Sequence, residues 1–138
     1  MKNFIQINHL KPADRIIVPK SVLGIIDHHA VYLGKNYAGQ DLIAENVFGQ
    51  SVRIITADEF SIHNPIINRI ETFKGTGLER KEAVEHALRL IGRPYDLINF
   101  NCEHFANEVQ HKISFSPQVK FAFGLLGFIA LVIIISKQ

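Results

Sequence analysis

The side chain with the clearest chemical potential is the single cysteine, Cys102, in the segment Asn-Phe-Asn-Cys-Glu-His-Phe at positions 99–105. Asn101 precedes it and is typical of a helix N-cap, which predicts that the cysteine lies in the first turn of a helix. The backbone N–H groups and dipole of that turn favour the nucleophilic thiolate and lower a cysteine pKa from about 8.5 to roughly 3.5–7.5. The alternative is an inert thiol in the core.

A nucleophilic cysteine needs a base that takes the thiol proton and later returns it to the leaving group. The adjacent histidines His28 and His29 begin a segment rich in β-branched and aromatic residues, which predicts a strand. Because side chains alternate along a strand, the two imidazoles are expected on opposite faces, so at most one reaches Cys102. His104 points about 200° away from the cysteine on its helix and is expected to be structural. Glu103 is interpreted as an ordinary first-turn charge.

Composition argues against several other kinds of site. One cysteine allows no internal disulfide and no site with two or more Cys ligands. A zinc site from this cysteine and the two adjacent histidines is disfavoured because neighbouring strand residues do not converge on one ion, so no metal and no cofactor are expected. Without Lys120 and Lys137, the formal net charge falls from +2 to zero for residues 1–118. No nucleic-acid partner is therefore expected.

The first half of the chain predicts an antiparallel β meander. Several stretches are rich in β-branched and aromatic residues or alternate in polarity, and Gly, Pro or Asn residues separate them. They predict strands around Ile5 and Ile7 and over residues 15–18, 29–33, 42–46, 51–56 and 66–73. Residues 35–40 predict a hairpin connection, and residues 58–63 predict a short helical turn or loop.

After residue 77 the apolar spacing changes from two residues to about 3.6, which predicts helices. The first helix ends before Gly92 and Pro94 and has one apolar face, formed by Ala83, Val84, Ala87, Leu88 and Ile91. A second helix is predicted to begin near Asn101. The expected fold class is α+β, with a curled antiparallel sheet followed by two packed helices.

The end of the chain is strongly apolar. Residues 121–136 contain no charged side chain, and Lys120 and Lys137 flank them. A helix of this length covers roughly 24 Å of the about 30 Å of bilayer hydrocarbon, and snorkelling lysines extend it. The alternative is a buried core helix. We expect a catalytic domain over residues 1–113, a linker over 114–118 and a C-terminal membrane anchor over 119–138. The start of the chain lacks the apolar stretch of a signal peptide, which favours a cytoplasmic domain.

Two segments resemble a known family. The blocks Asp27-His-His-Ala-Val-Tyr-Leu-Gly34 and Asn101-Cys-Glu-His-Phe105 resemble those of the LRAT-like enzymes, the lecithin:retinol acyltransferase and phospholipase A/acyltransferase group. These enzymes are circularly permuted relatives of the NlpC/P60 papain-like hydrolases. The resemblance covers about residues 12–111 and includes the order of His before Cys. It implies that His28 is the base and that His29 takes the aromatic position that follows it.

The resemblance also implies a third catalytic residue on the returning strand, where enzymes of this group commonly carry a second histidine. Here that stretch reads Leu-Ile-Ala-Glu-Asn at 42–46, without a histidine. Glu45 or Asn46 is expected to orient His28 instead, with Glu45 favoured because its charge also stabilises an imidazolium. The alternative is a dyad of Cys102 and His28 alone.

The function that this resemblance implies is a membrane-anchored cysteine acyltransferase or phospholipase A. It would cleave esters of membrane glycerophospholipids through an acyl-thioester on Cys102 and pass the acyl group to water, an amine or an alcohol. One alternative is a cysteine peptidase or amidase of the NlpC/P60 type, which the missing export signal disfavours. Another is a catalytically silent membrane scaffold.

Overall fold

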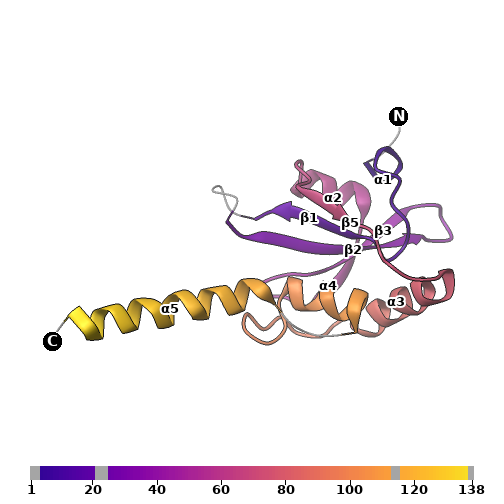
Figure 1. Ribbon diagram of the computed structural model, residues 1–138. Helices are drawn as coiled ribbons and strands as arrows, with labels where there is room; N and C mark the ends of the chain where they lie inside the picture. The colour runs from indigo at the N-terminus through magenta and orange to yellow at the C-terminus, as the bar shows by residue number, and fades with distance from the viewer. Residues whose placement is uncertain (1–3, 21–24, 113–115, 137–138) are drawn as a thin grey trace.

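The computed structural model describes residues 4–20, 25–112 and 116–136. It confirms an α+β fold built on a five-stranded antiparallel sheet (Figure 1). The strands are β1 (Arg15–Pro19), β2 (Asp27–Lys35), β3 (Asp41–Asn46), β4 (Val52–Thr56) and β5 (Arg69–Glu71). The helices are α1 (Phe4–Ile7), α2 (Ala57–His63), α3 (Gly77–Arg89), α4 (Cys102–His111) and α5 (Pro117–Ser136).

The sheet has the strand order β4-β3-β2-β1-β5, so three of its four pairings join neighbours in sequence. The sheet is open, with β4 and β5 at its two edges, and it does not curl as the sequence suggested. The strand expected over residues 66–73 is reduced to the three residues of β5. The strand expected around Ile5 and Ile7 is wrong: these residues form the one-turn helix α1, where Ile5 is buried and Ile7 is exposed. The alternation of apolar and polar residues there is no strand period, because Ile5 alone of the two isoleucines faces the core.

Two apolar clusters lie on the two faces of the sheet. On one face Val31 and Ala44 pack with Phe105 and Val109 of α4 and with residues of α3. On the other face the neighbouring strand residues, Tyr32 among them, pack against α1 and α2. The alternation of strand side chains therefore divides the core into two layers, and Figure 1 shows α2 and the α3–α4 pair on opposite sides of the sheet.

Capping side chains fix where α3 and α4 begin. Thr76 and Glu79 form a reciprocal capping box at the start of α3. Asn101 caps α4 as the sequence predicts, because its side chain accepts hydrogen bonds from the backbone N–H groups of Glu103 at 3.0 Å and His104 at 3.1 Å. The buried face of α3 is narrower than expected, since its buried residues are Ala83 and Ala87.

The C-terminal helix α5 extends away from the rest of the molecule (Figure 1). None of its residues is buried, so it is not a core helix. The helix has 20 residues, an 18-residue window of it has a mean hydropathy of 2.5, and by length and composition it can cross a membrane. The helix begins at Pro117, inside the expected linker, and residues 114 and 115 of that linker lie outside the described residues.

Candidate active site

The start of β2 has one open edge, and Cys102 lies beside it. β2 pairs with β1 down to Asp27, but its pairing with β3 begins only at Ala30. The carbonyl of Ile26 accepts a hydrogen bond from the N–H of Lys20, so alternate residues, Asp27 and His29, direct their backbone groups toward the unpaired edge. There the Cys102 Sγ lies 3.9 Å from the Asp27 carbonyl oxygen, and the backbone N–H of His29 donates to it.

Asn46, at the end of β3, holds the segment that leads into α4. Its side chain is fully buried, and Nδ2 donates a 2.7 Å hydrogen bond to the carbonyl oxygen of Phe100, two residues before the cysteine. The Phe100 ring lies under the Arg93 guanidinium, 3.5 Å from the ring centroid. Asn46 thus positions the chain before Cys102, and no hydrogen bond is recorded between its side chain and His28 within the described residues.

Glu45 contacts His28 directly. In the β2–β3 register Ala30 lies opposite Glu45, which places Glu45 diagonally across from His28 on the same face. Glu45 Oε2 is 2.7 Å from His28 Nε2, and Glu45 Oε1 accepts hydrogen bonds of 2.9 and 2.7 Å from Arg53. With Nε2 engaged, Nδ1 is the ring nitrogen left for the thiol. It is buried and makes no hydrogen bond of regular geometry within the described residues.

These contacts favour a thiolate–imidazolium pair. Burial by itself lowers the pKa of His28, but its interactions with Cys102 and Glu45 outweigh this and raise the pKa to about 9. Burial raises the pKa of Cys102, but the His28 side chain, the His29 N–H and the charge of Lys20 together lower it. The start of a helix also favours the thiolate. The arrangement can therefore supply a nucleophile and a proton donor at neutral pH.

His29 has opposite surroundings. Its Nδ1 accepts a 2.8 Å hydrogen bond from Arg15 Nε, so this nitrogen carries no proton. Burial is the largest cause that lowers the pKa of His29, to about 2, and the Arg15 charge acts in the same direction. His29 is thus held neutral and is no candidate for the base. The geometry agrees with the expectation that the ring of only one of the two histidines reaches Cys102.

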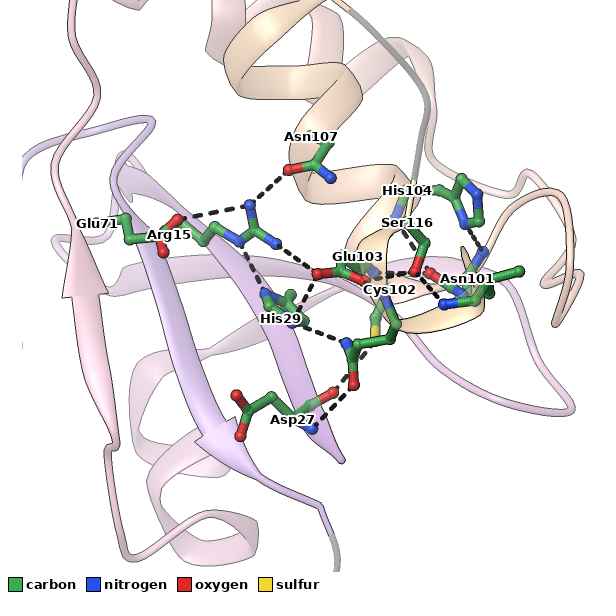
Figure 2. A network of polar contacts seen from close by, with 12 residues as sticks. Arg15, Asp27, His29, Glu71, Asn101, Cys102, Glu103, His104, Asn107 and Ser116 are labelled. Carbon is green, nitrogen blue, oxygen red and sulfur yellow. Dashed lines mark hydrogen bonds and ion pairs between the residues drawn. The ribbon is translucent and has the colours of Figure 1, made fainter. Parts of the chain in front are cut away.

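The structure agrees with the role expected for His104 and differs from the role expected for Glu103. His104 Nδ1 accepts a hydrogen bond from the Asn101 N–H at 3.3 Å, which completes a capping box and is the structural role expected. Glu103 is not an ordinary first-turn charge, because its side chain is buried among Arg15, His29 and Ser116 (Figure 2). The sequence around Glu103 does not indicate this burial, because its neighbours Asn101, His104 and Asn107 are themselves polar.

Comparison with known proteins shows which family the chain resembles. The sequence model of the lecithin retinol acyltransferase family matches residues 8–114. The chain belongs to this family. It is also similar to human phospholipase A and acyltransferase 2, with 28% identity over 119 residues that cover 75% of this chain and 74% of the relative. Cys102, His28, Glu45 and Asn46 all lie within the residues that the family model matches.

In this member of the lecithin retinol acyltransferase family, the cysteine opens into an apolar groove of about 740 Å³. Three parts of the chain line the groove around Cys102: the segment before β2, the loop before α4 and the first turns of α5. They contribute mainly large apolar side chains, including Ile25, Ile26, Leu97, Ile98, Phe121 and Leu125. Such a lining favours a ligand with a long hydrocarbon portion over a charged or polar one.

Proposed function

We propose that the chain is a membrane-anchored, thiol-dependent phospholipase A and acyltransferase that acts on glycerophospholipid esters. The observation that carries the proposal is that Cys102, which interacts with the His28–Glu45 pair, lines an apolar groove. Membership of the lecithin retinol acyltransferase family and the similarity to human phospholipase A and acyltransferase 2 support the same activity.

In the first half of the reaction, the Cys102 thiolate attacks the carbonyl carbon of the phospholipid ester. The negative charge that develops on the carbonyl oxygen is stabilised by backbone N–H groups of the first turn of α4, that of Cys102 among them. When the intermediate collapses, the C–O bond of the ester breaks and His28 gives its proton to the departing lysophospholipid oxygen. An acyl-thioester on Cys102 remains, with His28 neutral.

In the second half, water, an amine or an alcohol attacks the thioester, and His28 takes the proton of this acceptor. The C–S bond then breaks, which restores the thiolate and the imidazolium. Glu45 stabilises the charged form of His28 and, held by Arg53, keeps its ring in place. Asn46 acts through the backbone before α4, as a positioning residue for Cys102.

The lipid substrate is supported by the apolar tail. We assign residues 1–113 to the catalytic domain, 114–118 to a linker and 119–138 to a single-pass anchor, with the catalytic domain on the cytoplasmic side. No residue of the helix α5 is buried, and the helix is apolar enough to cross a bilayer. An anchor of this kind keeps the groove at the membrane surface, where phospholipid reaches it by lateral diffusion. The hydrocarbon lining of the groove disfavours a peptide or amide substrate.

The test is intact-protein mass spectrometry of the full chain in phosphatidylcholine vesicles, with the phospholipid content followed in parallel. We expect a fatty-acyl mass gain that hydroxylamine removes, or phospholipid loss where the thioester turns over quickly. Both are expected to disappear in Cys102→Ala and His28→Ala. His63→Ala, which changes an exposed histidine at the end of α2, is the matched control and should behave as the wild type.

Thermal unfolding of each variant shows whether the loss occurs in a folded protein. A folded wild type that gives neither an adduct nor phospholipid loss would overturn the proposal. An adduct that persists in Cys102→Ala would overturn the thioester mechanism while leaving the lipid substrate in place.

A further inference from the structure

A buried polar network joins α5 to the helix that carries the cysteine (Figure 2). Glu103, next to Cys102 on α4, accepts a hydrogen bond from the Ser116 hydroxyl through Oε2. The same carboxylate oxygen accepts the backbone N–H of Gln118 at 3.1 Å. Ser116 in turn accepts the Val119 N–H at 3.3 Å, so it caps the start of α5. One carboxylate of α4 thus holds the first turn of α5.

The same network reaches the strands of the active site. Glu103 Oε1 lies 4.0 Å from Arg15 Nη2 on β1 and 3.9 Å from His29 Nε2 on β2. The Gln118 side chain lies 3.2 Å from His29 Nε2 and accepts the Asp27 N–H at 3.3 Å. Arg15 is buried and also donates to Asn107 at 2.6 Å. Because buried charges need partners, this set constrains where α5 begins.

The rest of α5 is exposed from residue 120 to residue 136. None of the helix's residues is buried, and the helix extends away from the domain (Figure 1). Its first turns nevertheless line the groove at Cys102, through Phe121 and Leu125 among others. The position of this groove wall is therefore set by the polar contacts of Ser116 and Gln118 rather than by apolar packing.

We propose that Glu103 is a positioning residue that fixes α5 as one wall of the groove for the acyl chain. The inference rests on the proposed function and deepens it, since it makes the membrane helix a part of the substrate site as well as an anchor. A long acyl chain needs this wall, whereas a short ester needs only Cys102 and His28. Loss of the attachment should therefore discriminate between esters by chain length.

The test compares two esters on the full chain in lipid nanodiscs, dioleoyl phosphatidylcholine and p-nitrophenyl acetate. Glu103→Gln is expected to lower kcat/KM for the long-chain phospholipid on the order of ten- to a hundredfold, because the acyl chain loses the apolar contacts of several methylene groups with the displaced wall. With the acetate ester the same variant should stay within about twofold of the wild type, because only uniform binding of the long chain is lost. The effect should appear mainly as a raised KM.

Glu108→Gln is the matched control. Glu108 lies on the same helix and pairs with Arg93 at 3.2 Å and His86 at 3.3 Å, and no contact with α5 is recorded for it among the described residues. This variant should leave both esters near wild-type values. Ser116→Ala is the milder variant should Glu103→Gln fail to fold: it removes one hydrogen bond to Glu103 and keeps the charges. We expect it to lower long-chain turnover selectively, by about threefold.

Three outcomes separate the possibilities. An equal loss with both esters in folded Glu103→Gln would show that Glu103 supports Cys102 itself, which overturns the inference and leaves the proposed function intact. Wild-type behaviour of both Glu103→Gln and Ser116→Ala with both esters would also overturn it. Wild-type protein that reacts with neither ester would instead contradict the proposed function.

Discussion

His28 and His29 are adjacent residues of one strand, both buried, and their imidazoles have opposite chemistry. The exposed fraction is 8% for His28 and 2% for His29. Burial disfavours the charged form of both rings. The pKa of His28 nevertheless rises to about 9, because Cys102 and Glu45 favour its charged form more strongly. The pKa of His29 falls to about 2 because the Arg15 charge adds to the effect of burial. The charge of the partner, and not burial, decides which histidine holds a proton.

This difference follows from the alternation of side chains along β2. One position faces the carboxylate of Glu45, and the next faces the guanidinium of Arg15. The His28 side thus contains the groups that titrate during the proposed reaction. The His29 side contains a histidine that is held neutral, and its hydrogen bonds join the strands, α4 and α5.

The comparison is tested most strongly by the same substitution at both positions. His28→Gln is expected to slow acylation of Cys102 by p-nitrophenyl acetate about a hundredfold or more, because the group that stabilises the thiolate is lost. His29→Gln should slow it by about threefold at most, because Gln keeps an acceptor for Arg15 and His29 takes no proton in the reaction. Stopped-flow release of p-nitrophenolate measures both rates.

Thermal unfolding accompanies these rates, since His29 is deeply buried. A folded His29→Gln protein that loses as much activity as His28→Gln would break the comparison, because it would show that the His29 side also takes part in proton transfer.

Glu45→Gln tests why the pKa of His28 is high. The substitution keeps the shape of the side chain and removes its charge, so the imidazolium loses one of its two stabilising partners. We expect the pKa of His28 to fall from about 9 toward its ordinary value and acylation at pH 7 to slow on the order of thirtyfold, less than for loss of the base itself. NMR titration of the histidine rings measures the first effect.

The matched control for this variant is Glu59→Gln, which changes an exposed glutamate in the first turn of α2. Because His28 and Cys102 titrate together, both should be followed in the same samples. An unchanged His28 titration in Glu45→Gln would assign the raised pKa to the cysteine alone, and the site would then be a dyad.

Local patterns in the sequence were sufficient for several parts of this site. Asn101 predicts the start of α4, and the strand alternation predicts that His28 and His29 separate. Each of these depends on residues within a few positions of one another, where helix and strand geometry is fixed. The antiparallel meander from β1 to β4 follows from the same kind of local signal.

Local sequence patterns do not predict contacts between segments that are distant along the chain. The choice between Glu45 and Asn46 depends on the β2–β3 register, which contains an irregularity between Tyr32 and Gly34 that the sequence does not reveal. The burial of Glu103 depends on Ser116 and on Gln118, which lies in the first turn of a helix that looked like a plain anchor. The helix α1 also depends on packing across segments, because Phe4 stacks on Phe60 of α2.

The smallest expected effect is the contribution of His29 to the pH dependence of the free energy of unfolding. The folded-state pKa of His29 is about 2 and its unfolded value is about 6.5, so the unfolded chain binds an extra proton between these limits. Stability due to this group is present above pH 6.5 and is lost as the pH falls below it. Between pH 6.5 and 5 the loss amounts to about 1.5 kcal/mol. His29→Gln removes this contribution while keeping an acceptor for Arg15.

The measurement is urea unfolding at several pH values with the Cys102→Ala background in both proteins, so that the thiol does not titrate. The protein that retains His29 should lose about 1.5 kcal/mol more than its His29→Gln partner over this interval, since all other titrating groups are shared. Equal losses would mean that His29 accepts a proton in the folded state despite Arg15. In that case the two neighbouring histidines would differ in position only, and partner charge would not explain their separate roles.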